Sequence, residues 1–206
     1  MTLQRSGTVG WCTQSSQTRL RICLAACSRG GLGQCHTVTM PWTPERTLIL
    51  LRHSKSDWSG GEPDFERPLN ARGLREAPIA GRWLADNIGG IDLAVVSPAV
   101  RTRSTWKLAS AELDSVPSTR FEESAYGASA SVLLAIVRAL PDEAHTVILV
   151  GHNPGIEDLA SHIADESVSM STSVLAVIGM PGSWAAVDGS PGAILAFGRP
   201  PAPLGS

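Results

Sequence analysis

The stretch LILLRHSKSDW, residues 48–58, decides how the rest of the chain is interpreted. It begins with four consecutive apolar residues, a pattern typical of a strand covered on both faces of a sheet. The strand is expected to end at Arg52 and His53, a permanent cation beside an imidazole that titrates near neutral pH. Two such side chains at the end of a buried strand indicate a binding or catalytic site and direct attention to the other strand ends.

Length and composition indicate a globular domain. The chain has 206 residues, 43% of them hydrophobic, which is enough for one domain with a hydrophobic core. No apolar run is long enough to span a bilayer, and a net charge of −2 gives no reason to expect nucleic acid as a partner. Because the chain after Met40 lacks cysteine, we expect a cytoplasmic protein. The oligomeric state stays open.

The first 40 residues differ in composition from the rest. They contain all four cysteines and four arginines, whereas all 19 acidic residues follow Met40. We interpret residues 1–40 as a disordered extension, with the working protein beginning at Met40. A targeting peptide is one alternative, since Arg-rich, acid-poor segments are typical of transit peptides. A zinc module is another, although the cysteines lack CxxC pairs. Residues 199–206 are expected to form a flexible, proline-rich tail.

The chain after Met40 alternates strand-like and helix-like segments. Apolar runs predict strands at 47–51, 93–96, 146–150, 173–178 and 193–197. Helical patterns lie at about 71–87, 98–113, 130–140 and 154–164. Pro78 either kinks the first of these helices or marks its true first turn. The alternation predicts one α/β domain, residues 41–198, with a mainly parallel sheet.

The residues that follow two further strands resemble each other. Residues 97–105 read SPAVRTRST, and residues 151–158 read GHNPGIED. In each segment a serine or asparagine, Ser97 or Asn153, precedes a proline, and we predict that it caps a helix starting directly after the strand. Such helix N-termini favour anions.

Four side chains are thereby expected at neighbouring strand ends: Arg52, His53, Arg101 and His152. Ligands of parallel sheets bind outside the carboxyl ends of the strands. Guanidinium groups match the oxygens of a phosphate in a bidentate manner, and a neutral imidazole can attack phosphorus. The sequence therefore predicts a site for a phosphate dianion with a histidine nucleophile.

Five motifs then occur in a fixed order: LRHSKSDW, RPLNARG, VVSPAVRTRST, YGAS and VILVGHNPGIEDLA. This ordered set resembles the histidine phosphatase superfamily, most of all its short SixA-type phosphohistidine phosphatases, and the resemblance extends over roughly residues 47–197. The resemblance implies a phosphoglycerate-mutase-like fold, a three-layer α/β/α sandwich around a mainly parallel sheet. The family's commonest opening is Arg-His-Gly, and Ser54 stands here in the place of the glycine.

The resemblance also implies a role for each of the four residues. His53 would be the nucleophile that becomes phosphorylated. The phosphate would be bound by Arg52, Arg101 and His152. No cofactor and no metal would be needed.

The general acid of the reaction is less well defined by the motifs. Many members of the superfamily carry an acid between the second arginine and the second histidine, which implies Glu122 as the first choice here and Glu123 as its neighbour. Asp57, in the loop after the nucleophile, is an alternative.

The spacing of the motifs bears on the substrate. Strands and helices nearly fill the intervals between His53, Arg101 and His152, so little chain is left for a deep lid. We therefore expect an open site that admits a phosphorylated protein side chain, phosphohistidine in particular. A small phosphomonoester is the alternative substrate.

Two other classes of function are kept as alternatives. A metal-dependent hydrolase would use His152, Glu157 or Asp158, and His162 as ligands. A phosphate-binding module without catalytic activity would use the same pocket as the phosphatase.

Overall fold

The computed structural model describes residues 44–188 and 190–201, together with three short strands nearer the N-terminus. The chain divides into two compact units, Met1–Thr43 and Pro44–Ser206. In the first unit, a small antiparallel sheet is formed by β1 (Val9–Gly10), β2 (Cys23–Ala26) and β3 (His36–Thr37). The interpretations of residues 1–40 as an extension, a targeting peptide or a zinc module depend largely on residues outside the described part, as does the predicted flexible tail.

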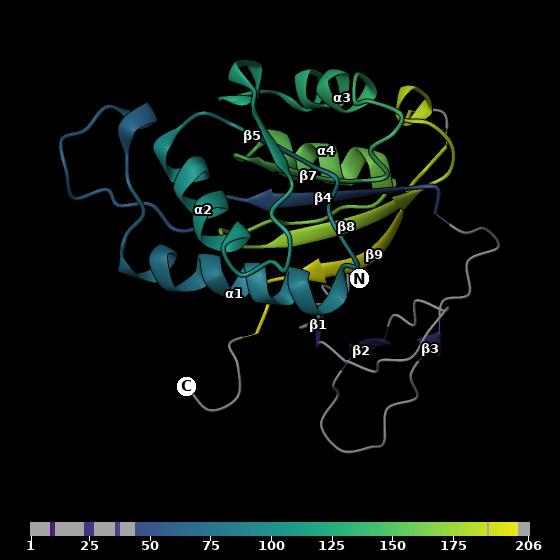
Figure 1. The fold of residues 1–206 in the computed structure, drawn as a ribbon, viewed down its shortest axis with the longest axis horizontal. Helices are drawn as coiled ribbons and strands as arrows, with labels where there is room; N and C mark the ends of the chain where they lie inside the picture. Colours follow the sequence, from purple (N-terminus) through teal and green to yellow (C-terminus); the bar gives the residue numbers. More distant parts are fainter. Residues whose placement is uncertain (1–8, 11–22, 27–35, 38–43, 189, 202–206) are drawn as a thin grey trace, which may run out of the picture. The chain divides into compact units, whose positions relative to one another are not determined.

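A six-stranded sheet forms the centre of the second unit (Figure 1). Its order is β6-β5-β7-β4-β8-β9; the first four strands pair in parallel, and β8 pairs antiparallel with both β4 and β9. The strands are β4 (Arg46–Arg52), β5 (Leu93–Val96), β6 (Ser118–Phe121), β7 (Thr146–Gly151), β8 (Leu175–Met180) and β9 (Ala193–Gly198). The predicted α/β class with a mainly parallel sheet is confirmed.

Helices cover both faces of this sheet (Figure 1). Figure 1 shows α1 and α2 along one side, and α3 and α4 along the other. The helices are α1 (Ala71–Asn87), α2 (Val100–Ser110), α3 (Ala130–Arg138) and α4 (Gly155–Ala164). The described residues also form the short 3₁₀ helices η1 (Asp64–Glu66), η2 (Glu123–Ala125) and η3 (Trp184–Ala186). The result is the expected three-layer sandwich.

The central position of β4 explains its uninterrupted apolar sequence. Residues 48–51 have no exposed surface. Leu48 and Leu50 belong to the core that also contains Leu133 of α3 and Ile156 of α4. Because successive side chains of a strand point to opposite faces, the residues between them contact the layer on the other side of the sheet. Both faces are thus buried, as the sequence indicated.

The predicted helix caps are wrong. The N-cap of α2 is Ala99 and that of α4 is Pro154, so each helix starts later than predicted, and neither residue forms a side-chain cap hydrogen bond. Ser97 and Asn153 instead bind partners in other elements of the site, described below. Tertiary contacts have here replaced a local preference.

Two further details differ from the expectation. Pro78 lies inside α1, which begins at Ala71, so this proline does not mark the first turn. The edge strand β6, with the sequence STRF, was not predicted. Its side chains are mostly exposed, and so the apolar run that reveals buried strands is missing. Within the described part of the chain, no helix is long and apolar enough to cross a membrane.

Candidate active site

The register of the sheet brings the ends of its central strands together. Arg52 at the end of β4 pairs with Gly151 at the end of β7, so His53 and His152 follow their strands side by side. Their ring centroids lie 5.1 Å apart. Ser97 directly follows β5, the other neighbour of β7. The predicted convergence of these residues at one edge of the sheet is therefore observed.

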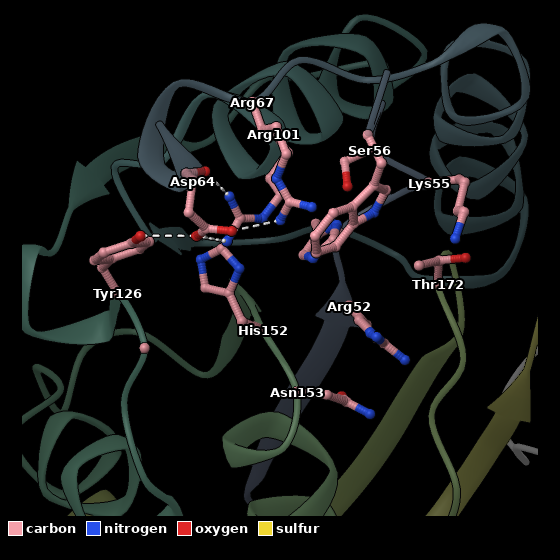
Figure 2. A pocket seen from close by; sticks show the side chains of 13 residues that line it. Arg52, Lys55, Ser56, Asp64, Arg67, Arg101, Tyr126, His152, Asn153 and Thr172 are labelled. Carbon is pink, nitrogen blue, oxygen red and sulfur yellow. Dashed lines mark hydrogen bonds and ion pairs between the residues drawn. The ribbon is translucent and has the colours of Figure 1, made fainter. Parts of the chain in front are cut away.

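A pocket of about 460 Å³ opens at this edge (Figure 2). All four residues predicted from the strand ends line it. The complete lining is Arg52, His53, Lys55, Ser56, Trp58, Asp64, Arg67, Arg101, Tyr126, Gly127, His152, Asn153 and Thr172. Its volume lies within the range of small-ligand sites in proteins.

The geometry around His53 prepares one ring nitrogen for attack. Nδ1 lies 2.8 Å from the carbonyl oxygen of Ser54. A carbonyl only accepts, so Nδ1 carries the proton and Nε2 of the neutral ring keeps its lone pair. Burial lowers the pKa of His53 to about 4, and the positive charges of Arg101 and Arg52 add to this effect. The imidazole is therefore neutral at physiological pH.

His152 is also held neutral and is oriented by a serine. Its Nε2 lies 2.8 Å from Oγ of Ser97, and both residues are buried. Its Nδ1 has no hydrogen-bond partner among the described residues. Burial lowers the pKa of His152 to about 3, with smaller contributions from His53 and Arg101. One nitrogen of a fixed, neutral ring thus remains available for a ligand.

A carboxylate occupies the cationic side of the pocket (Figure 2). One oxygen of Asp64 accepts a hydrogen bond from Arg67, at 2.6 Å, and the other accepts from Arg101, at 2.9 Å. The hydroxyl of Tyr126 donates to the second oxygen as well, at 2.8 Å. The bond from Tyr126 and the two guanidinium groups lower the pKa of Asp64. The group is therefore ionised and pairs with both arginines.

Arg52 is held by the segment around Met170, which precedes β8 in the chain. Its Nη1 donates to the carbonyl oxygen of Met170 at 2.6 Å, an oxygen that also accepts from Nδ2 of Asn153 at 2.9 Å. Glu157 accepts from Asn153 Nδ2 at 3.0 Å and from the backbone N–H of Met170 at 2.6 Å. Burial lowers the pKa of Arg52, and the charge of Glu157 opposes this effect. Asn153 of the GHNP motif therefore does not cap α4. It helps to fix the carbonyl group of Met170 that binds Arg52.

The loop that carries the nucleophile is tied to α2 and α1. The N–H of Ser54 donates to Oγ1 of Thr105, whose hydroxyl donates to the carbonyl oxygen of Arg101. Oγ of Ser54 lies 2.9 Å from Oγ of Ser173, which in turn donates to Glu76 of α1 at 2.7 Å. Ser54 is fully buried, so the serine in the place of the family's glycine contributes to support behind the pocket.

Two glycines of the motifs permit close backbone approaches. Asn70 caps α1 by accepting from the N–H of Gly73, and a Cβ at Gly73 would overlap the carbonyl oxygen of Lys55. A Cβ at Gly155, in the first turn of α4, would overlap the carbonyl oxygen of Ala128. The motifs RPLNARG and GHNPG therefore bring the loops at residues 55–58 and 126–128 against helix ends, beside the pocket.

The predicted general acid is not in the pocket. Glu122 accepts from Ser124 Oγ at 2.6 Å, and neither Glu122 nor Glu123 lines the site. Asp57 accepts from Ser59 and does not line it either. Among the described residues, the carboxylate that lines the pocket is Asp64. Glu122 lies between the end of β6 and the start of η2, two elements that the sequence did not reveal, and its role as the general acid stays a prediction.

Several pocket residues were not predicted from the sequence. Arg67 and Tyr126 stand within the motifs RPLNARG and YGAS but were given no role. Arg67 is 8% exposed, and its guanidinium carbon lies 3.5 Å from the ring centre of Trp58, which is 72% exposed at the pocket. Asp64 lies in the loop after the nucleophile, where no periodic pattern marks it. An Arg or Tyr inside a recognised motif is the signal that would have identified the first two.

The ligands of the alternative metal site do not come together. His162 lies 2.7 Å from Asp188, and Glu157 binds the backbone N–H of Met170. No group of three or more His, Cys, Asp or Glu side chains placed to hold a metal ion occurs in the part of the chain that the structure describes. The structure therefore does not support the metal-dependent hydrolase that used His152 and His162.

Comparison with known proteins supports this description. Residues 48–146 match the histidine phosphatase superfamily (branch 1). An uncharacterized protein of Mycobacterium tuberculosis, strain H37Rv, is 34% identical over 161 residues, which cover 73% of this chain and 99% of that protein.

Two solved structures are similar over the same region. A protein of Nakamurella multipartitia assigned as the phosphohistidine phosphatase SixA is 28% identical, with a TM-score of 0.69 over 78% of this chain and 100% of that chain. A protein of Agrobacterium tumefaciens with the same assignment is 28% identical, with a TM-score of 0.66 over 77% of this chain and 100% of that chain. The chain therefore belongs to the histidine phosphatase superfamily, in its SixA-like branch, and is a phosphatase that acts on a phosphorylated substrate.

Proposed function

We propose that the protein removes the phosphoryl group from a phosphohistidine side chain of another protein, through a covalent phosphohistidine at His53. The observation that carries this proposal is the state of His53. Its Nδ1 donates a hydrogen bond to the carbonyl oxygen of Ser54. Nε2 therefore keeps its lone pair, inside a pocket lined by arginines. A neutral, oriented imidazole among fixed cations is the arrangement that attack on a phosphoryl dianion requires.

The proposed reaction has two balanced steps. In the first, Nε2 of His53 donates its electron pair to phosphorus, and the bond from phosphorus to the leaving nitrogen breaks with that nitrogen keeping the electron pair, while the leaving imidazole takes a proton from solvent on its other nitrogen. In the second, water attacks the phosphohistidine, the bond from phosphorus to Nε2 breaks, and inorganic phosphate and a proton are released. In both steps Arg52, Arg101 and Arg67 stabilise the charge spread over the phosphoryl oxygens.

The second histidine fits a role in phosphate binding. His152 is neutral, and its Nε2 is occupied by Ser97. If Ser97 donates to Nε2, then Nδ1 carries the proton and can donate to a phosphoryl oxygen. A neutral donor next to His53 adds a hydrogen bond without a further lowering of the nucleophile's pKa.

The state of Asp64 supports a substrate with a good leaving group. This carboxylate accepts hydrogen bonds from Arg67, Arg101 and Tyr126, and its pKa is lowered. An ionised carboxylate held in this way is a poor proton donor. An alkyl phosphate needs such a donor, because an alkoxide leaves reluctantly. The imidazole of phosphohistidine is readily protonated by solvent and needs less help. The kinship with SixA-like proteins supports the same substrate class.

The experiment that tests the substrate compares three phosphorylated compounds at matched concentrations. A phosphohistidine peptide, a phosphoserine peptide of the same sequence and a small alkyl phosphate are incubated with the purified protein. We expect kcat/KM to be highest for the phosphohistidine peptide and turnover to be abolished in His53→Ala. His162→Gln, which alters an exposed histidine outside the pocket, is the matched control and should retain the activity of the wild type.

Three outcomes would count against the proposal. A higher kcat/KM for the alkyl phosphate would identify a small phosphomonoester as the substrate. Binding of inorganic phosphate without turnover of any compound would favour the phosphate-binding module. We also expect turnover to survive chelation by EDTA, whereas loss on chelation and recovery with Zn²⁺ or Mg²⁺ would favour a metal-dependent hydrolase.

A further inference from the structure

The pocket contains a polar region that the phosphoryl chemistry does not use. Figure 2 shows Lys55, Ser56 and Thr172 at the side of the pocket away from Tyr126 and Asp64. A single phosphoryl group is much smaller than the pocket's volume of about 460 Å³. The region around Lys55 is therefore available to the part of the substrate that carries the phosphoryl group.

The side-chain donors of this region have no partner among the described residues. No described residue forms an ion pair or hydrogen bond with the ammonium group of Lys55, and none bonds to the side-chain hydroxyls of Ser56 and Thr172. By contrast, Arg101 and Arg67 pair with Asp64. Lys55 is half-buried, and a lysine that lines a pocket together with two available hydroxyls favours the binding of an anion.

The charge of the pocket leads to the same conclusion. Its lining contains four cations, Arg52, Lys55, Arg67 and Arg101, and the carboxylate of Asp64. Both histidines are neutral, so the net charge of the lining is +3. A phosphoryl dianion leaves one positive charge without an anion. That charge is most simply assigned to Lys55, the cation without a described partner.

The backbone of this region is fixed before a ligand binds. The carbonyl oxygen of Lys55 accepts from the N–H of Asn70, the N-cap of α1, at 3.0 Å. Ser56 forms an isolated bridge with Leu69. On the other side, the carbonyl oxygen of Thr172 accepts from Nη2 of Arg199 at 2.9 Å. The three donors are therefore presented by backbone that hydrogen bonds hold in place, which reduces the entropy cost of binding.

We infer that Lys55, Ser56 and Thr172 form a subsite for a carboxylate next to the phosphoryl group of the substrate. The inference rests on the proposed function and extends it. The phosphorylated protein would carry an aspartate or glutamate beside its phosphohistidine. Because Lys55 follows the nucleophile by two residues, the two anionic groups of the substrate would be bound by one short segment of the chain.

The test uses two substrate pairs that differ in one carboxylate. The first pair consists of phosphohistidine peptides in which the neighbouring residue is either glutamate or glutamine. The second pair consists of phenyl phosphate and its carboxyphenyl analogue. The measured quantity is the ratio of kcat/KM between the acidic and the neutral member of each pair. The variants are Lys55→Met and Lys107→Met, which replace the two lysines of the chain one at a time.

We expect the acidic peptide to be preferred about 5-fold by the wild type, the effect of one partly exposed ion pair. The preference should disappear in Lys55→Met, return in Lys55→Arg, persist in Lys107→Met and weaken as salt is raised. A ratio of one in the wild type, or an unchanged ratio in Lys55→Met, would overturn the inference. A Lys55-dependent preference confined to the aryl pair would overturn the assignment to a protein substrate.

A measurement of peptide binding tests this inference independently of the proposed function. The same peptide pair is titrated calorimetrically into His53→Ala, which cannot form the phosphohistidine. A tighter Kd for the acidic peptide that requires Lys55 supports the subsite even if no peptide is hydrolysed. Equal Kd values for both peptides contradict it, even if the wild type hydrolyses both.

Discussion

Ser97 Oγ lies 2.8 Å from Nε2 of His152, and this hydrogen bond is buried between the ends of β5 and β7. Ser97 has no exposed surface, and its N–H and carbonyl oxygen bond to Val150 and Thr102. The serine is thereby fixed from three directions, and it fixes in turn the ring of His152. The bond leaves Nδ1 of His152 for the substrate, so Ser97 acts as a positioning residue for phosphate binding.

Ser97→Ala is expected to lower kcat/KM about 10-fold, the effect of losing one hydrogen bond to the group that binds phosphate. Without the hydroxyl of Ser97, nothing holds the ring of His152 in the tautomer with its proton on Nδ1. Nδ1 then no longer always carries the proton that it donates to the phosphate. Steady-state kinetics with an aryl phosphate measure the effect. Ser110→Ala is the control, because Ser110 is also buried but bonds within its own helix. An equal loss of kcat/KM in both variants would show that Ser97 has only a structural role.

The dependence of the rate on pH follows from the two neutral histidines. The pKa values of His53 and His152 are lowered to about 4 and about 3, so neither ring is protonated as the pH falls through 6.5. After correction for ionisation of the substrate, kcat/KM should stay level through pH 6.5 and fall only near pH 4. A pH–rate profile with an aryl phosphate measures this. A descending limb centred on 6.5 would show that the nucleophile is not buried as described.

The same shifts predict an acid-sensitive fold. In the unfolded chain both histidines titrate near 6.5, whereas in the folded chain they stay neutral to lower pH. Between these values the unfolded state binds more protons, so the free energy of unfolding decreases as the pH falls below 6.5. The melting temperature should therefore drop from pH 6.5 toward about 4, and the drop should be shallower in His152→Gln. Identical slopes in both proteins would contradict this assignment.

Asp64 is expected to compete with the substrate for Arg67 and Arg101. Asp64→Asn should increase the affinity for inorganic phosphate about 5-fold, because two guanidinium groups lose an anionic partner while the amide oxygen can still accept from Tyr126. The inhibition constant of phosphate measures the effect, with the exposed neighbour Glu66→Gln as the control.

The leaving group distinguishes this role from that of a general acid. If Asp64 is ionised in the substrate complex, Asp64→Asn should change kcat for an activated aryl phosphate and an alkyl phosphate by the same factor. A loss of 100-fold or more, roughly, that is confined to the alkyl phosphate would identify Asp64 as the general acid instead. Glu122→Gln should affect neither substrate, since Glu122 lies outside the pocket.

The sequence predicted the strands and helices whose residues are buried in the core. The strands around Ile49, Val95 and Ile148 are continuous apolar runs because both faces of the central sheet are covered. The predicted meeting of His53 and His152 followed from the same reasoning, since parallel strands end at one edge. Element boundaries were accurate to a few residues wherever a strand or helix contributes to the core.

The sequence did not predict what depends on contacts across loops. The edge strand ending at Phe121 is mostly exposed and has no apolar pattern, so neither this strand nor the position of Glu122 outside the pocket could be predicted. Asp64 reaches the pocket because it bonds to Arg101, a residue far from it in the sequence. Ser97 and Asn153 carried a strong local signal for helix caps, but buried partners from other elements determined their roles.

The identity of the phosphorylated residue tests the central claim most directly. The wild type is mixed with a radiolabelled phosphohistidine peptide, quenched within a single turnover in alkali, where phosphohistidine persists, and digested for peptide mapping. We predict an acid-labile label on His53, absent from His53→Ala and present in His162→Gln. A label on His152, or hydrolysis at the wild-type rate by His53→Ala, would contradict the account.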